Sequence, residues 1–406
     1  MPSNIIKKSL KKIAELFLLI VVIPLMFFGV LELAVRALDV DTEVVKNDSF
    51  KIATPIWAAN DFNFFAAEGL YRDILHNALP ASAAEWMRYF EEARHVRYKM
   101  KPNISARAVN TVNRIELEKG KKILLQSNSD GYRTAEIPVE KPEGVYRVAV
   151  LGDSTAFGWG VEPEARYSQI LEDKLNALGT GTTFQVMNFG IPGYTSYHGR
   201  EVFDHYALKY APDLVIFTFG ANDGKMITQS AKKVLQDKGT LEDIKYLLWN
   251  LETYKLLRKW ILSQSDPFKK KSAGSAKPEP KVPYATLQEY RGNLEYMVDY
   301  CRANGMRPVF LGLCCPLDYL AKMSALGKSK GIPAFDGMRL LLKSIPAIKH
   351  GELYPDLALF YKQLYGPDVL KSRRLLWVTN DTCHPNRLGH QLIADLLFDR
   401  LFQDHK

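Results

Sequence analysis

The sequence predicts an α/β domain with a flavodoxin-like, five-stranded parallel sheet, preceded by an N-terminal transmembrane helix. Short apolar runs recur along the chain and a helical stretch follows them, which is the pattern of βαβ units. A long uncharged stretch near the N-terminus predicts the transmembrane helix. The 406 residues are 47% hydrophobic and 24% charged, so the chain can bury a large core and is not intrinsically disordered as a whole.

The N-terminal helix is expected over residues 13–38. Sixteen consecutive residues, Leu16–Leu31, carry no charge, and about 20 residues cross a bilayer as a helix. The basic tail 1–12 holds four lysines, which favours a cytoplasmic N-terminus and places the rest of the chain outside the cytoplasm. We therefore predict an uncleaved signal anchor. A signal peptide cleaved near Val35-Arg36-Ala37 and a buried core helix are the alternatives.

Residues 39–144 are expected to form an N-terminal decoration of the main domain. Its patterning is mostly helical up to about Tyr98 and β-like over 105–125. The main domain is predicted over 145–402. Its five strands are expected at 146–151, 184–188, 214–219, 307–313 and 375–379.

An insertion of about residues 225–288 separates the third and fourth predicted strands. It contains a predicted helix, Leu241–Leu262, whose apolar residues recur mostly at helical spacing. Packing on the main domain is the first interpretation of this helix, and a lid or a face resting on the membrane is the second. The Lys/Pro/Ser/Gly-rich stretch 266–283 is expected to be an exposed flexible loop.

Polar residues follow four of the five predicted strands. Open α/β sheets bind ligands at the carboxyl ends of their strands, so these loops are the candidate site. They contain Gly152-Asp153-Ser154 after the first strand, Gly190 after the second, Asn222-Asp223 after the third, and Asp381 with His384 after the last.

These residue types are the ones that nucleophilic acyl transfer needs. Ser154 is the expected nucleophile, His384 its general base, and Asp381 the carboxylate that orients the imidazole. The backbone N–H groups of Ser154 and Gly190 and the side-chain amide of Asn222 are the expected donors of an oxyanion hole. Asp153 and Asp223 are expected to support the site by capping a helix or holding a loop.

The four motifs together resemble those of the SGNH (GDSL-type) hydrolase superfamily. The resemblance covers about residues 145–402, apart from the insertion. It implies a three-layer α/β/α sandwich, esterase, lipase or acyl-transfer activity, no metal and no cofactor, and the same site roles. The anchor and the first 140 residues resemble the layout of bacterial cell-envelope members, which implies a single-pass protein of the inner (cytoplasmic) membrane with a periplasmic or extracellular catalytic domain.

The leading functional hypothesis is a membrane-anchored serine esterase that removes O-acyl groups, O-acetyl above all, from a cell-envelope glycan or lipid. An O-acyltransferase that passes the acyl group to a polysaccharide is one alternative. A membrane acyltransferase is a possible protein partner of both the esterase and the O-acyltransferase. A non-catalytic envelope binding or assembly protein is the second alternative.

Nucleic acid is not an expected partner despite the net charge of +9. The tail 1–12 and the loop 266–283 hold nine lysines, so little positive charge is left for a basic groove elsewhere. No GxGxxG or Walker pattern follows a predicted strand, which argues against a nucleotide or redox function.

The four cysteines and three further residues carry secondary expectations. No CxxC pair or Cys/His cluster with zinc spacing occurs. A disulfide from Cys314 or Cys315 to Cys383 would brace the histidine loop, and free buried thiols are the alternative. His198 and His205 are expected to be packing or surface histidines, and Tyr194 to line the site.

Overall fold

The structure is a computed structural model of the full chain. It describes residues 11–12, 15–38, 40, 89–109, 122–227, 230–236, 244, 247–248, 251–264, 282–372, 375–378 and 383–402. The chain divides into two compact units, which we describe separately. The first comprises Met1–Pro55 and Lys238–Lys277, and the second Ile56–Asp237 and Pro278–Lys406.

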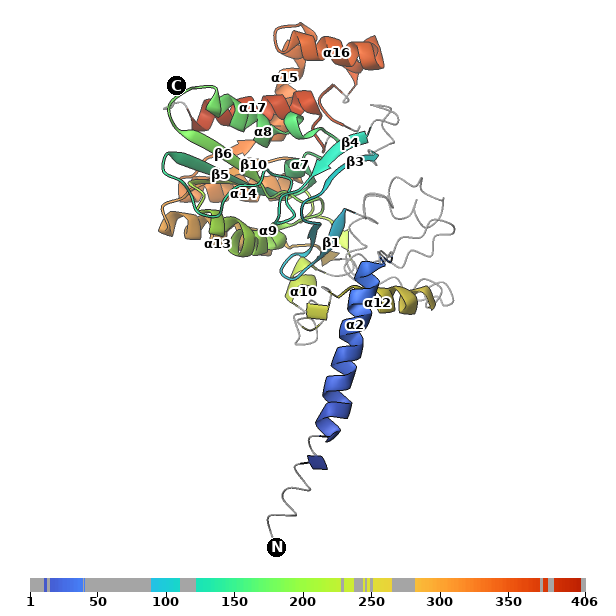
Figure 1. Ribbon diagram of the computed structural model, residues 1–406. Helices are drawn as coiled ribbons and strands as arrows, with labels where there is room; N and C mark the ends of the chain where they lie inside the picture. Colours follow the sequence, from blue (N-terminus) through green and yellow to red (C-terminus); the bar gives the residue numbers. More distant parts are fainter. Residues whose placement is uncertain are drawn as a thin grey trace, which may run out of the picture. The chain divides into compact units, whose positions relative to one another are not determined.

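A five-stranded parallel sheet forms the centre of the second unit (Figure 1). Its strand order is β11-β10-β7-β5-β6, and every pair runs parallel. The strands are β5 (Val145–Gly152), β6 (Thr183–Asn188), β7 (Leu214–Thr218), β10 (Arg307–Gly312) and β11 (Ala334–Asp336). The chain passes from β5 out to β6 and then back across to β7, so strand order reverses between β5 and β7. This flavodoxin-like order confirms the predicted fold class.

Helices cover both faces of the sheet, which makes the unit a three-layer sandwich (Figure 1). On one face α8 (Tyr167–Asn176) packs against α17 (Arg387–Leu401), and on the other lie α9 (Ser196–Val202), α13 (Leu287–Ala303) and α14 (Leu317–Lys330). The strands are apolar without alternation because both faces are covered: every residue of β7 is buried.

Further helices and helical turns complete the description of the second unit. They are α7 (Ser154–Phe157), α10 (Ala231–Gln236), α15 (Gly337–Lys349), α16 (Pro355–Tyr365), the 3₁₀ turns Pro163–Ala165, Leu208–Tyr210 and Pro367–Lys371, and the π-helical turn η4 (Phe203–Ala207).

The predicted fifth strand, 375–379, is wrong. The fifth strand is β11, whereas Leu375–Val378 form no strand of the sheet. These four residues are buried, but their main chain bonds to the neighbouring loop: Val378 N–H donates to the His384 carbonyl (2.7 Å) and Asn386 N–H to the Leu376 carbonyl (2.9 Å). A short buried apolar run has the same sequence pattern in a strand and in a buried loop, so periodicity could not separate them.

Among the described residues, three small antiparallel pairs lie outside the main sheet. They are β1 (Phe90–Ala93) with β2 (Arg97–Met100), β3 (Ser105–Val109) with β4 (Lys122–Gln126), and β8 (Met226–Ile227) with β9 (Val282–Pro283). The β3–β4 pair agrees with the β-like pattern of 105–125. The helical pattern expected up to Tyr98 is wrong for the hairpin 90–100, and residues 41–88 lie outside the described residues.

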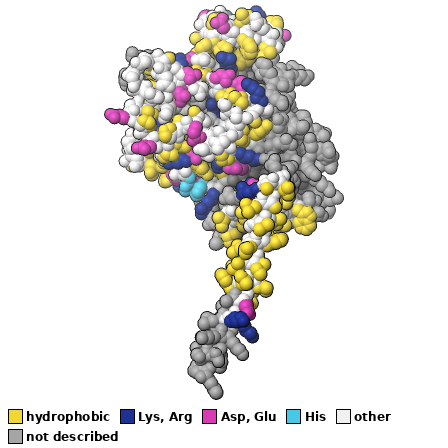
Figure 2. All heavy atoms as spheres, viewed as in Figure 1, with side chains coloured by type: hydrophobic (Ala, Val, Ile, Leu, Met, Phe, Trp, Pro, Cys, Tyr) yellow, Lys and Arg dark blue, Asp and Glu magenta, His cyan; other side chains and the backbone are white. Residues whose placement is uncertain are grey.

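The first unit contains one apolar helix that is long enough to cross a membrane. It runs over Glu15–Ala37, 23 residues with a mean hydropathy of 2.7, and includes a π-helical turn (Leu18–Val22) and α2 (Ile23–Ala37). Hydrophobic side chains cover its exposed surface (Figure 2). The helix thus has the length and composition predicted for 13–38.

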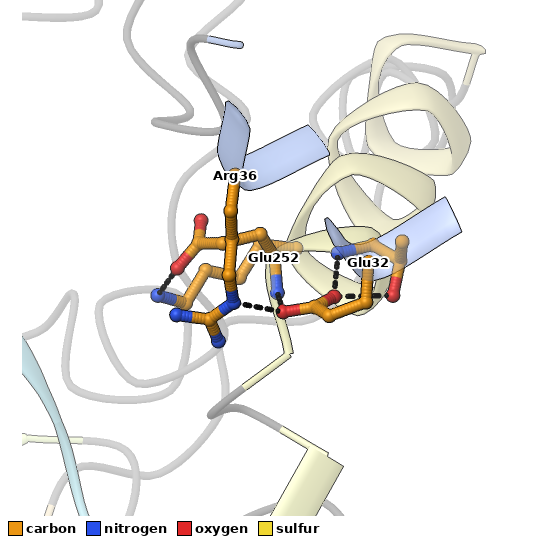
Figure 3. A network of polar contacts seen from close by, with 5 residues as sticks. Glu32, Arg36 and Glu252 are labelled. Carbon is orange, nitrogen blue, oxygen red and sulfur yellow. Dashed lines mark hydrogen bonds and ion pairs between the residues drawn. The ribbon is translucent and has the colours of Figure 1, made fainter. Parts of the chain in front are cut away.

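A second helix of this unit, α12 (Glu252–Gln264), begins against the C-terminal part of α2. The Glu32 carboxylate accepts hydrogen bonds from the backbone N–H groups of Glu252 and Thr253, both at 2.9 Å, and from the Thr253 hydroxyl at 2.8 Å (Figure 3). Arg36 Nε donates to the same carboxylate at 2.7 Å. Glu32 therefore caps the N-terminus of α12. Most of the expected loop 266–283 lies outside the described residues.

Candidate active site

Ser154 is the first residue of the short helix α7, just after the inner strand β5. Gly152, at the end of β5, has no room for a side chain, because a Cβ there would lie 2.3 Å from Thr218 Cγ2. Asp153 caps the helix: its Oδ1 accepts from the backbone N–H and the hydroxyl of Thr155, both at 2.8 Å. The tight turn thus fixes Ser154 at the carboxyl end of the sheet.

His384 and Ser154 form the central pair of the site. His384 Nε2 lies 2.9 Å from Ser154 Oγ, and the two residues are only 6% and 7% exposed. A serine hydroxyl at this distance can donate its hydrogen to an unprotonated imidazole nitrogen. The pair therefore has the geometry of a nucleophile and its general base.

The loop that carries His384 is bonded to the buried segment Leu375–Val378. Asn386 begins α17, and its side-chain amide donates to the Leu375 carbonyl at 3.1 Å. Trp377 and Pro385 form an isolated β-bridge. The segment wrongly predicted as a strand is therefore the support of the histidine loop.

A disulfide joins Cys314 to Cys383, with 4.6 Å between the Cα atoms. It ties the residue before His384 to the chain just after β10. The predicted bond is thus present, and its partner is Cys314 and not Cys315. Cys301 and Cys315 have free thiols.

Asp381, the predicted third member of the triad, lies outside the described residues. Asp153 is the carboxylate closest to the serine in the sequence, but its Oδ1 is engaged by Thr155. Its Oδ2 has no hydrogen-bond partner among the described residues, and burial raises the pKa of this carboxyl. Asp153 fits a capping role, as expected.

Gly190 approaches α7 more closely than any other residue type could. A Cβ at this position would lie 2.5 Å from the backbone nitrogen of Phe157. Its own N–H donates to Asn188 Oδ1 at 2.9 Å, while Asn188 Nδ2 donates to the Ala156 carbonyl at 2.7 Å. The expected oxyanion donor is therefore engaged within its own loop, and the main observed role of Gly190 is to let this loop pass α7.

Asn222 lies in the loop after β7, beside β5 at the reversal of strand order. Its Nδ2 donates to the Tyr194 carbonyl at 3.0 Å, and the residue is buried. A side-chain amide has two N–H hydrogens, so this bond fixes the group and leaves a second hydrogen for a ligand.

Asp223 joins the loop after β7 to the start of α9. Its carboxylate accepts from the Ser196 N–H (3.0 Å) and hydroxyl (2.6 Å) and from the Gly220 N–H (3.1 Å). The side chain is completely buried, and burial raises its pKa to about 7. These contacts agree with the loop-holding role expected from the sequence.

Arg133 is a supporting residue that the motifs did not indicate. Its buried guanidinium donates to the carbonyls of Phe157 (3.1 Å) and Gly158 (2.8 Å) at the C-terminal end of α7, and to those of Leu124 and Val161, both at 2.9 Å. The carbonyls of Phe157 and Gly158 have no hydrogen-bond partner within α7, because the helix ends there. A lone arginine in a turn carries no sequence signal for such a role.

The three secondary residues fall behind the site or away from it. Tyr194 is fully buried and donates its hydroxyl to the Tyr98 carbonyl, so it backs Asn222 and does not line an open site. His198 stacks on Tyr194 with ring centroids 4.7 Å apart, which confirms packing. His205 is on the surface, as expected, where its ring stacks on His95.

The fold and the site together define a class: an α/β protein with a serine–histidine pair at the carboxyl ends of a doubly wound parallel sheet. The sequence model of the GDSL-like lipase/acylhydrolase family matches residues 150–392, more than half of the chain. The protein belongs to this family.

A curated relative gives a partial match. The chain is 33% identical over 95 residues to an arylesterase of Vibrio mimicus. That match covers 22% of this chain and 46% of the relative, so it spans about half of the relative's length.

The similar solved structures are distant in sequence. TesA is 14% identical, with 64% of this chain and 99% of that one covered and a TM-score of 0.37. An acetylxylan esterase of Geobacillus stearothermophilus is 15% identical, with 64% and 95% covered and a TM-score of 0.36. The esterase EstA of a Pseudoalteromonas species is 16% identical, with 62% and 94% covered and a TM-score of 0.36.

Proposed function

We propose that the protein is a membrane-anchored serine esterase that hydrolyses O-acyl esters, O-acetyl esters above all, on a glycan or lipid of the cell envelope. The observation that carries the proposal is the 2.9 Å contact between His384 Nε2 and Ser154 Oγ in a chain of the acylhydrolase family. A hydroxyl paired with an imidazole in a largely buried site is the arrangement that makes serine a nucleophile.

In the proposed reaction, Ser154 Oγ attacks the ester carbonyl while His384 takes the hydroxyl proton. The tetrahedral intermediate collapses when His384 returns that proton to the leaving alcohol, and an acyl group remains on Ser154. Water, deprotonated by His384, then attacks the acyl-enzyme, and His384 returns the proton to Ser154 Oγ as the acid leaves. Asp381 is the proposed carboxylate that orients the ring and stabilises its protonated form.

The intermediate carries an oxyanion, which needs fixed hydrogen-bond donors. We assign this role to the backbone N–H of Ser154 and to the second amide hydrogen of Asn222. The bond from Asn222 to the Tyr194 carbonyl supports this assignment, because it holds the amide in place before a substrate arrives. Gly190 would contribute a third donor only if its N–H turned away from Asn188.

The membrane location rests on the apolar helix Glu15–Ala37 and the lysines before it. With the N-terminus in the cytoplasm, the domain lies in the periplasm or outside the cell. The disulfide supports this side of the membrane, because disulfides persist in oxidising compartments. The ester would then belong to the envelope.

The helix α12 is proposed to rest on the membrane surface. Glu32, in the last part of the apolar helix, caps the first turn of α12, so the two helices meet near the point where the chain leaves the bilayer. Leu257 and Trp260 are exposed and three residues apart, hence on one face of α12. An aromatic residue on such a face is typical of the membrane interface.

The test is hydrolysis of p-nitrophenyl acetate by the full chain in detergent, with Ser154→Ala as the matched variant. Turnover by the wild type and its loss in the variant would support the esterase. A folded wild type that neither turns over nor reacts with a fluorophosphonate would contradict it. Product analysis with an acetylated glycan separates hydrolysis from transfer, because hydrolysis releases free acetate and transfer forms a newly acetylated glycan.

A further inference from the structure

Two histidines and a glutamate converge at the surface of the second unit, away from Ser154. His95 lies in the turn between β1 and β2, Glu201 on α9, and His205 in the π-helical turn η4. One ligand atom from each lies within 4.8 Å of the others. His95 Nδ1 is 3.9 Å and His205 Nε2 is 3.6 Å from the same oxygen, Glu201 Oε2.

We propose that these three side chains bind a zinc ion. Two imidazole nitrogens and one carboxylate oxygen form a zinc ligand set, with a fourth position for water. Bonds of about 2.0–2.2 Å to one ion place tetrahedral ligand atoms about 3.4 Å apart. The two contacts to Glu201 are within about half an ångström of that separation, so the ligand atoms need only small shifts in position once the rings turn toward the ion.

The two imidazole rings lie close together beside Glu201. The rings of His95 and His205 stack with centroids 3.6 Å apart, and each has a nitrogen within 3.9 Å of Glu201 Oε2. Because an imidazole binds zinc in the plane of its ring, the rings rotate out of this stack when both nitrogens bind one ion. Glu201 and His205 are four residues apart, which places them on one side of the helix. The side chains are 29% (His95), 27% (Glu201) and 42% (His205) exposed, so an ion can enter from solvent and still be enclosed.

The site would fasten the β1–β2 hairpin to the helix behind the active site. The hairpin also contacts the loop after β6: the Tyr98 hydroxyl donates to the Pro192 carbonyl at 2.6 Å, and the Tyr98 carbonyl accepts from Tyr194. The Tyr194 carbonyl in turn holds Asn222. Zinc would therefore hold the hairpin in position. An effect of zinc on catalysis through Tyr194 and Asn222 rests on the proposed function, in which Asn222 is an oxyanion donor.

Zinc binding is tested on the full chain in detergent, without a polyhistidine tag and stripped by a chelator. Titration calorimetry and metal analysis should find one Zn²⁺ per chain. His95→Ala and His205→Ala should each weaken binding at least about tenfold, since each removes one of three ligands. His350→Ala is the control, because His350 faces Glu352 at 3.7 Å on an exposed surface and should leave the affinity unchanged.

Hydrogen exchange supplies a readout that does not depend on activity. Zinc should slow exchange of the hairpin amides of Tyr98 and Lys101, which donate to the carbonyls of Val96 and Tyr89, in the wild type and not in His95→Ala. Unfolding temperatures without zinc, equal in wild type and variants, would show that the variants fold. No stoichiometric binding by the wild type, or equal weakening by His350→Ala, would overturn the site. Binding without slower exchange would overturn the role in holding the hairpin.

Discussion

The guanidinium of Arg133 donates a hydrogen bond to the main-chain carbonyl of Phe157, the last residue of the helix that Ser154 begins. The same group reaches the Gly158 carbonyl, so one buried side chain closes the end of α7 while Asp153 caps its start. A helix of four residues contains few internal hydrogen bonds, so the bonds made by Arg133 and Asp153 at its two ends stabilise it.

Replacing Arg133 by Met should lower both stability and activity. Four main-chain carbonyls would each lose a hydrogen bond, three of them in buried contacts, and we expect the free energy of unfolding to fall by about 3 kcal/mol or more. Denaturant unfolding measures the change. Arg107→Met is the control: Arg107 makes an exposed ion pair with Glu162 at 3.1 Å and should change stability by less than about 1 kcal/mol. Equal effects of the two substitutions would contradict the role of Arg133.

Ser154→Ala and His384→Ala should each reduce kcat by about 10³-fold or more, and the double variant should be no slower than the worse single one. This non-additivity follows if the two side chains act as one unit across their 2.9 Å contact. Steady-state hydrolysis of p-nitrophenyl acetate checks it. Ser329→Ala, which removes a helix hydroxyl bonded to the Leu326 carbonyl, should retain activity. If the reduction of kcat in the double variant equalled the product of the two single reductions, the two groups would act separately.

Asn222→Ala should reduce kcat by about 10²–10³-fold with a much smaller change in KM. The reason is that the amide is proposed to bind charge that exists only in the tetrahedral intermediate. Kinetics at several substrate concentrations separate the two parameters. If instead KM rose and kcat stayed constant, Asn222 would contribute to ground-state binding and not to the oxyanion hole.

Thiol titration checks the disulfide. Denatured, unreduced protein should show two reactive thiols, those of Cys301 and Cys315, and reduction should raise the number to four. Cys315→Ser should leave one thiol before reduction. Cys383→Ser should release Cys314 and lower the free energy of unfolding by about 2–4 kcal/mol, since the bond closes a long loop. Four thiols in the unreduced protein would contradict the bond.

The pH dependence of stability should report Asp223. Its pKa is raised from 3.8 to about 7 in the fold, so the folded state holds a proton that the unfolded state has lost between these values. Stability contributed by the protonated form is complete below about pH 4 and declines as pH rises to about 7. Relative to Asp223→Asn, the wild type should therefore lose a few kcal/mol over this range, at about 1.4 kcal/mol per unit of pKa. A constant difference between pH 4 and 7 would contradict the shift.

Four of the five strands could be predicted from the sequence, and with them the positions of three candidate site residues. Ser154, Gly190 and Asn222 could be placed because each follows a strong apolar run, and the ends of parallel strands meet at one edge. The fifth strand could not be found, because Ala334–Asp336 is three residues long and only partly buried, whereas the fully buried Leu375–Val378 is more apolar and forms a loop.

Contacts that depend on packing could not be predicted from the sequence either. The bond from Gly190 N–H to Asn188 and the four bonds of Arg133 join residues whose types are common in turns. The disulfide illustrates the same limit. Cys314 and Cys315 are adjacent in the sequence, so the sequence could not decide which of them bonds to Cys383. In the structure the bonded residue is Cys314, which has a left-handed backbone with φ of 57°.

Glu32 also has a practical consequence for preparing the protein. Cutting away an apolar N-terminal helix is a common way to obtain soluble material, and here the cut would remove the acceptor for the first amides of α12. The shortened chain would start α12 with two uncapped N–H groups, although every residue of the catalytic domain remained. An aspartate or serine introduced at position 251, the residue before α12, would supply the missing acceptor from the N-cap position. A change in activity after shortening could then be attributed to loss of the membrane and not to fraying of α12.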